Sequence, residues 1–110
     1  MDFEIVVSEV DGVPVVRVFG EVDIYSAPRL AECLEDLVAD GKIELAVDLE
    51  HCTYMDSEGI KVLVSVIRSI GQEGSLTICC APSSILRTLH IVGLDSLLRI
   101  IPSMNDLKSE

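Results

Sequence analysis

Ser57 stands between two acidic residues in the segment Asp56-Ser57-Glu58-Gly59, and its hydroxyl is the first candidate for a reactive or modified group. The residues before it, 45–49, form a short aliphatic run typical of a buried strand. The residues after it place apolar side chains at i, i+3, i+4, i+7 and i+10, which predicts an amphipathic helix. These are Ile60, Leu63, Val64, Ile67 and Ile70. Ser57 is therefore expected where a strand gives way to a helix, a place where α/β sheets carry functional groups and where helix N–H groups favour negative charge.

Spacing alone favours a simple role for this turn, in which Asp56 or Ser57 accepts a hydrogen bond and caps the helix. A nucleophilic Ser57 is disfavoured, because a nucleophile elbow needs Gly-x-Ser-x-Gly and Met55 replaces the first glycine. His51 and His90 show no catalytic arrangement and are more typical of solvent or core positions. The turn also lacks the glycines and the lysine of a phosphate-binding loop. We therefore predict that the chain is not an enzyme.

The four cysteines do not have the spacing of a metal site. No Cys-x-x-Cys pair is present, and Cys79 and Cys80 would point to opposite faces of a predicted strand. Cys33 falls on the apolar stripe of a predicted helix. We expect buried or half-buried reduced thiols and no bound metal.

Alternating apolar segments predict the elements that position the Ser57 turn. Strands are expected at residues 3–10, 13–19, 43–49, 76–80 and 97–101. Helices are expected between Ser26 and Gly41, from Ile60 to about Ile70 and from Pro82 to Gly93, with a short one after Pro102. Asp11-Gly12 predicts a hairpin turn between the first two strands. The order β-β-α-β-α-β-α-β-(α) predicts one α/β domain over residues 1–110, with a mixed, mostly parallel sheet flanked by helices.

A second segment, residues 20–26, follows another predicted strand and is expected to be a loop. Ser26 should cap the helix that follows, and Asp23 by itself is an ordinary turn residue that binds local backbone. Neighbouring parallel strands end at one rim of a sheet, so this loop and Ser57 are expected to lie close together.

The net charge of -11 argues against a nucleic acid partner and against an anionic membrane surface. A basic protein partner is compatible with it. No apolar run reaches the ~18 residues of a membrane helix, and Met1-Asp2-Phe3-Glu4 lacks the basic stretch of a signal peptide. We expect a cytoplasmic protein.

The segments Asp48-Leu49-Glu50 and 54–59 closely resemble the phosphorylation segment of bacterial anti-sigma factor antagonists, which belong to the STAS-domain family. The segment 20–27 resembles the loop and helix start beside it. In the family, a Ser or Thr directly after the Asp is phosphorylated by the anti-sigma factor, which is also a serine kinase, and Ser57 is the matching residue. A second Ser or Thr often follows in the family, whereas this chain has Glu58, which either weakens phosphorylation or partly mimics it.

The resemblance implies a curved STAS sheet over essentially the whole chain and a partner-switching cycle. The unphosphorylated protein would bind the anti-sigma factor kinase and free the sigma factor. Phosphorylation of Ser57 with the kinase's ATP and Mg²⁺ would end binding, and a serine phosphatase would reset it. The nucleotide would then belong to the partner, so the resemblance implies no cofactor bound to this chain. Asp56, Glu58 and Gly59 would form the acceptor turn. Asp23, Tyr25 and Ser26 would contact the partner.

A different reading of the same family remains open at this point. The chain would then be a STAS scaffold that assembles with itself or with other regulators, without routine phosphorylation of Ser57. In either case we expect a monomer or a weak homodimer.

Overall fold

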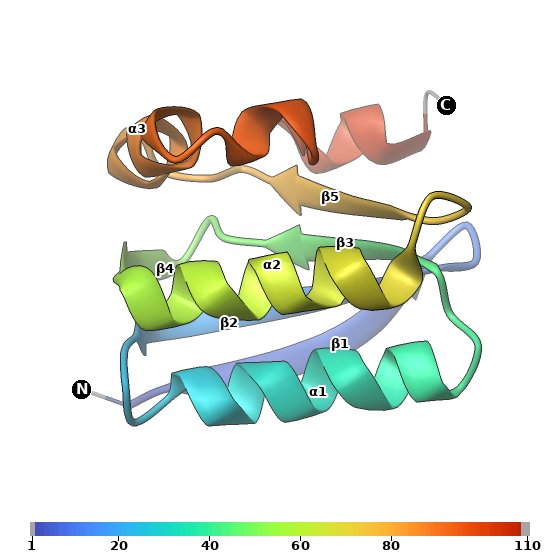
Figure 1. The fold of residues 1–110 in the computed structure, drawn as a ribbon, viewed down its shortest axis with the longest axis horizontal. Coiled ribbons are helices and arrows are strands. Elements are labelled where there is room, and N and C mark those ends of the chain that lie inside the picture. The colour runs from blue at the N-terminus through green and yellow to red at the C-terminus, as the bar shows by residue number, and fades with distance from the viewer. Residues whose placement is uncertain (1, 109–110) are drawn as a thin grey trace.

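The computed structural model of the chain describes residues 2–108, and its first two strands form the expected hairpin (Figure 1). β1 (Glu4–Val10) pairs antiparallel with β2 (Val13–Val22). Asp11 and Gly12 turn the chain with φ angles of 50° and 85°, the left-handed pair that a tight hairpin needs. The Asp-Gly dipeptide therefore predicted this turn correctly.

β2 runs further than the sequence indicated, so residues 20–22 belong to a strand and the predicted loop there is wrong. Gly20 has a φ of 100°, and the register shifts between Gly20 and Glu21. A Cβ at Gly20 would lie 2.7 Å from the carbonyl oxygen of Asp2, which only glycine avoids. The bulge lets β2 continue and bend toward a second partner strand.

The other strands confirm the mixed, mostly parallel sheet. β2 pairs in parallel with β3 (Glu44–Asp48), β3 with β5 (Ser75–Cys79), and β5 with β6 (Arg99–Ile101), which gives the order β1-β2-β3-β5-β6. An additional strand that the sequence did not reveal, β4 (Cys52–Met55), pairs in parallel with the last residues of β2. The pairing of β3 with β2 ends at Asp48. The chain then turns, and β4 pairs with β2 again from Cys52.

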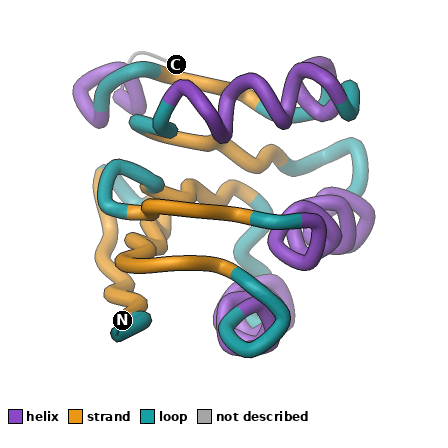
Figure 2. The backbone as a smooth tube through the Cα atoms, turned by 90° about the vertical axis from the view of Figure 1, so that its left-hand side faces the viewer, coloured by secondary structure: helices purple, strands orange, loops and turns teal. Residues whose placement is uncertain are grey.

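Three helices cover one face of the sheet. They are α1 (Ala27–Ala39), α2 (Ser57–Ile70) and α3 (Ser83–Ile91), and the short 3-10 helix η1 (Leu94–Ser96) follows α3. Figure 2 shows α1 and α2 side by side against the strands. Leu30, Leu63 and Leu89 contribute to an aliphatic core with Val16 and Val18 from β2. Hydrophobic periodicity thus placed the helices correctly, because burial of this face drives their packing.

The ends of the last elements differ from the predicted ones. α3 ends at Ile91, so Val92, expected on the buried face, is exposed. The final strand begins at Arg99 and not at residue 97 as predicted, and residues 94–96, to which the sequence assigned no element, form η1. No helix within residues 2–108 combines the length and the apolar character that a bilayer-spanning segment needs.

The opposite face of the sheet carries a smaller apolar cluster. Its buried members are Val15, Ala46, Cys79, Ile101 and Leu107. Leu107 comes from the C-terminal 3-10 helix η2 (Met104–Lys108), which is the short terminal helix that the sequence predicted. Cys80 packs against the same cluster as Cys79 because β5 ends at Cys79 and Cys80 turns with a φ of 58°. The strand alternation that predicted opposite faces for the two thiols therefore does not apply.

Candidate functional site

The turn between β4 and α2 contains both candidates for the helix cap, Asp56 and Ser57. Asp56 is the N-cap, and its Oδ1 accepts a hydrogen bond of 2.8 Å from the Glu58 N–H. Ser57 is the first residue of α2 and is exposed. Among residues 2–108, no hydrogen bond engages its hydroxyl. The capping role therefore belongs to Asp56, and the Ser57 hydroxyl is accessible at a helix N-terminus.

Gly59 allows α2 to begin directly against the strands. A Cβ at this buried position would collide with the side chain of Met55 and lie 2.9 Å from Cγ1 of Val22. A side chain at this position would therefore push the first turn of α2 away from β4 and β2. The predicted role of Gly59 in shaping the acceptor turn has this steric basis.

A compact hydrogen-bonded turn follows β2. Oδ1 of Asp23 accepts hydrogen bonds from the N–H groups of Tyr25 and Ser26, at 2.9 and 3.1 Å. These N–H groups, that of Ser26 first, hold the pKa of the Asp23 carboxyl below its ordinary value. Asp23 therefore organises local backbone, as its residue type alone indicated.

Ser26 occupies the N-cap position of α1 as predicted, but its side chain does not cap the helix. Its hydroxyl donates to the carbonyl oxygen of Glu21 at 2.6 Å and accepts from the Asp23 N–H at 2.9 Å. The residue is only 6% exposed. A direct contact between this hydroxyl and a partner would require the turn to open, whereas Tyr25 is 87% exposed and needs no such change.

The two turns lie side by side, as the sequence argument about a shared rim predicted. Val22 pairs in parallel with Met55, and the Asp56 N–H donates to the carbonyl oxygen of Val22 at 3.1 Å. Asp23 and Asp56 therefore follow directly from bonded strand ends. Met55, at the end of β4, brings the two turns together by pairing with Val22, and β4 is the strand that sequence patterns missed.

Exposed apolar side chains belong to the segments around this rim. Ile24 is 63% exposed and Tyr54 51% exposed, and Tyr25 belongs to the same turn as Ile24. A hollow of about 360 Å³ lies along the start of α1 and α2. It is lined by Ile24, Ala27, Pro28, Ala31, Glu35, Glu58, Lys61, Val62 and Ser65. Apolar side chains bordered by charged ones are typical of a protein-docking surface.

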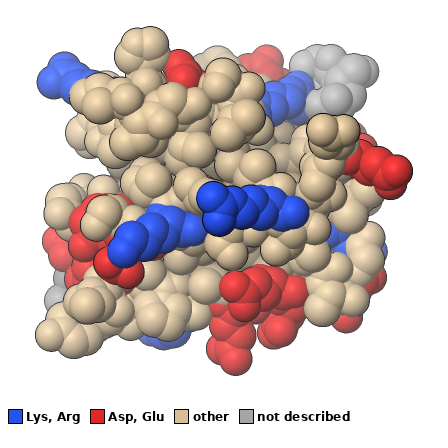
Figure 3. All heavy atoms as spheres, in the orientation of Figure 1, with Lys and Arg blue, Asp and Glu red and all other residues tan. Residues whose placement is uncertain are grey.

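Charge is unevenly spread over the helices that border the hollow. Figure 3 shows cationic side chains running over α2 and acidic side chains gathered over α1. The cations of α2 are Lys61 and Arg68, and α1 contributes Glu32, Glu35 and Asp36. The helix that begins with Ser57 therefore carries two cations on this face, in a protein with 19 acidic residues against 8 Lys and Arg.

Neither histidine is arranged as a base for Ser57. The ring of His51 stacks on Phe19, with centroids 5.1 Å apart and an interplanar angle of 6°. His90 is an exposed residue of α3, and its Nδ1 lies 2.7 Å from Oδ2 of Asp95. Both rings are exposed and have other contacts, so the geometry offers Ser57 no activating imidazole.

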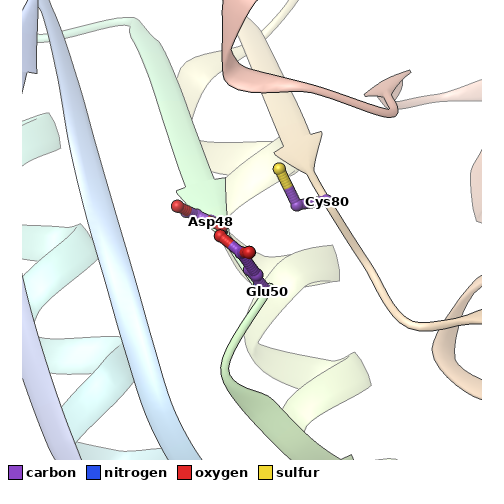
Figure 4. A group of neighbouring side chains, drawn as sticks. All are labelled: Asp48, Glu50 and Cys80. Atoms are coloured by element: carbon purple, nitrogen blue, oxygen red, sulfur yellow. The ribbon is translucent and has the colours of Figure 1, made fainter.

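Sequence spacing missed one group of potential metal ligands, Asp48, Glu50 and Cys80 (Figure 4). Their ligand atoms all lie within 4.8 Å of one another, at the ends of β3 and β5 and in the loop between β3 and β4. Oδ1 of Asp48 already accepts the Glu50 N–H at 3.0 Å, and Oδ2 lies 3.6 Å from Nε of Arg17. Burial and the two carboxylates raise the pKa of the Cys80 thiol, which disfavours the thiolate that a metal would need.

The sheet order, the helices on one face and the Ser57 turn together define a known class. The chain belongs to the STAS domain family, whose model matches residues 4–107. This confirms the resemblance seen in the sequence.

The relatives to which the chain is similar are named as anti-sigma factor antagonists. The anti-sigma-F factor antagonist RsfB of Mycobacterium tuberculosis is 30% identical over 102 residues, covering 93% of this chain and 84% of RsfB. The anti-sigma-B factor antagonist of Staphylococcus aureus is 35% identical over 86 residues, covering 77% of this chain and 80% of the relative. A crystal structure of an anti-sigma factor antagonist from Mycobacterium paratuberculosis matches with a TM-score of 0.90 at 30% identity, covering 98% of this chain and 92% of that one.

Proposed function

We propose that this chain is an anti-sigma factor antagonist controlled by phosphorylation of Ser57. In its unphosphorylated form it binds an anti-sigma factor serine kinase, which then releases its sigma factor. The kinase brings ATP and Mg²⁺ and transfers a phosphoryl group to Ser57, after which binding falls. A serine phosphatase restores the unphosphorylated form. The names of the relatives support the antagonist role.

One observation carries the choice of Ser57. Its hydroxyl is exposed at the first position of α2, and Asp56 has taken over the capping function that would otherwise occupy it. A kinase can therefore reach the hydroxyl without disturbing the helix. Asp56 and Gly59 hold the turn in place, through the cap and through the close approach of α2 to the strands.

The docking surface that we propose surrounds this hydroxyl. Tyr25, Ile24 and Tyr54 supply exposed apolar area, and Asp23 fixes the turn that carries two of them. Ser26 supports the surface from inside that turn. Such an arrangement suits a partner with an apolar centre and a basic rim, because the chain is strongly acidic.

A phosphate on Ser57 would weaken binding through local charge. It adds about -1.5 to -2 units of charge beside Asp56 and Glu58, within the docking surface. The helix N–H groups tolerate this charge, so the fold is expected to persist. The phosphate would have to lose its hydration against the apolar centre of the partner, which costs several kcal/mol and is enough to end binding.

The test is intact-mass analysis after incubation with ATP, Mg²⁺ and each anti-sigma kinase candidate of the source organism. Wild type is compared with Ser57→Ala and with Ser69→Ala, which removes an exposed hydroxyl of α2 that does not line the hollow. We expect one added phosphate on wild type and Ser69→Ala and none on Ser57→Ala, with kinase binding lost on phosphorylation. A phosphate that persists in Ser57→Ala would assign the acceptor elsewhere. No phosphate with any candidate would favour the scaffold reading.

A further inference from the structure

Lys61 is the cation placed to respond to a charge on Ser57. It follows Ser57 by four residues in α2, and residues at i and i+4 of a helix lie on one face, one turn apart. Its Nζ lies 3.3 Å from Oε2 of Glu58, with the Lys61 side chain 73% exposed. The ammonium group is therefore paired with a neighbour of Ser57 and exposed enough to reach another partner by side-chain rotation.

No other cation of this region has the same freedom. Arg68, the next cation in α2, follows Lys61 by seven residues, which is about 10 Å along a helix axis. Arg29 in α1 has its guanidinium 5.0 Å from the centroid of the Phe3 ring and donates to the Phe3 carbonyl oxygen at 3.5 Å. A phosphate on Ser57 would thus have acidic neighbours on both sides and Lys61 one turn away.

We propose that phosphorylation of Ser57 transfers Lys61 from Glu58 to the phosphate. This inference rests on the proposed function. The phosphate carries more charge than a carboxylate and offers three strong acceptor oxygens. An acidic group that precedes a lysine by four residues has the favourable orientation of a helical ion pair. The exchange needs only a change of side-chain rotamers, with the backbone of α2 unchanged.

The exchange alters more than the charge at position 57. Lys61 and Glu58 both line the hollow along α1 and α2, where Glu35 already supplies a carboxylate. Once Lys61 turns to the phosphate, Glu58 presents an uncompensated charge in this hollow. Phosphorylation therefore changes two adjoining parts of the proposed docking surface, the rim at Ser57 and the hollow beside it.

The experiment uses the full chain with phosphoserine placed at position 57 during synthesis, so that no kinase is required. The second pKa of the phosphate is measured by phosphorus NMR across a pH titration. The variants are Lys61→Gln, Lys61→Arg and Arg68→Gln, the last being a matched loss of an exposed cation from the same helix. We expect Lys61→Gln to raise the phosphate pKa by about 0.3 unit, Arg to restore it, and Arg68→Gln to leave it nearly unchanged.

Two results would overturn the inference. An unchanged phosphate pKa in Lys61→Gln would mean that Lys61 stays away from the phosphate. An equal shift in Lys61→Gln and Arg68→Gln would mean that only the general charge of the helix matters. Neither result depends on the kinase, so a failure of the proposed function would be seen separately, as the absence of enzymatic phosphorylation in the intact-mass test.

Discussion

The Asp56 N–H donates to the carbonyl oxygen of Val22 at 3.1 Å, and this bond joins the ends of β4 and β2. It links the turn that carries Ser57 to the turn that carries Asp23 and Tyr25. Residues more than thirty positions apart in the chain thereby form one continuous rim. The proposed docking surface depends on this junction, and each of the following variants tests a contact within it or beside it.

Ser26→Ala should destabilise the protein by about 1 to 3 kcal/mol, because it removes two part-buried hydrogen bonds of the Ser26 hydroxyl, one to the Glu21 carbonyl and one from the Asp23 N–H. Urea unfolding measures the change. Ser69→Ala is the control, since its exposed hydroxyl bonds only to the Ser65 carbonyl of the same helix, and it should cost less than about 0.5 kcal/mol. Equal stabilities for the two variants would show that the Ser26 bonds contribute nothing beyond a surface hydroxyl.

Gly59→Ala should also destabilise the protein, by about 1 to 3 kcal/mol, although alanine normally favours helix. The added methyl group would collide with the Met55 side chain and approach Val22. Thermal and urea unfolding give the measurement, with Ser65→Ala as an exposed control in α2 that should be neutral or slightly stabilising. A Gly59→Ala protein more stable than wild type would mean that Met55 moves aside without cost and that helix propensity prevails.

Asp23 should contribute to stability at neutral pH and lose that contribution in acid. The N–H groups of Ser26 and Tyr25 lower its pKa in the folded state from the ordinary value of 3.8. A carboxyl with a lowered folded-state pKa stabilises the fold above the unfolded-state value, and the effect disappears as the pH falls through the folded-state value.

The measurement for Asp23 is the melting temperature of wild type and Asp23→Asn across a pH series. The difference between them should be largest at neutral pH and should shrink below about pH 4. A difference that stays constant down to acid pH would show that charge on Asp23 is not what stabilises the turn.

The Cys80 thiol should react slowly with alkylating reagents, because burial first, and then Asp48 and Glu50, raise its pKa. Glu50→Gln removes one of these charges and should speed alkylation of Cys80 by iodoacetamide at about pH 8, since the thiolate is the reacting form. Peptide mass spectrometry separates Cys80 from Cys79, whose pKa burial raises to about 12.

The control for this reactivity is Glu73→Gln, which removes an exposed acidic charge from the loop before β5. It should leave the alkylation rate of Cys80 unchanged. A rate that rises equally in both variants would trace the effect to overall charge, and an unchanged rate in Glu50→Gln would remove Glu50 as a cause.

Local patterns predicted those parts of the fold that local forces determine. The Asp11-Gly12 dipeptide specified a turn because both residues tolerate positive φ, and the spacing from Ile60 to Ile70 predicted α2 because burial selects one helix face. The sequence also placed Ser57 correctly at the junction of strand and helix. Each of these inferences depends only on residues that are close together in the sequence.

Contacts between distant segments account for what the sequence did not reveal. β4 is four residues long, with exposed Thr53 and Tyr54 between buried ends, and it is a strand only because β2 extends past its bulge to meet it. The hydroxyl of Ser26 bonds to Glu21, although its position indicated a helix cap. Asp48, Glu50 and Cys80 meet because β3 and β5 end side by side, which no spacing within one segment indicates.

The pairing of β4 with β2 also bears on the thermodynamics of recognition. Both turns of the rim are held by backbone bonds and short side-chain bonds before any partner arrives. A partner that docks on them therefore has little loop motion to freeze, and less of its contact energy is spent on conformational entropy. If a charged group on the rim removed a few of these contacts, a backbone held in this way would have little freedom to replace them.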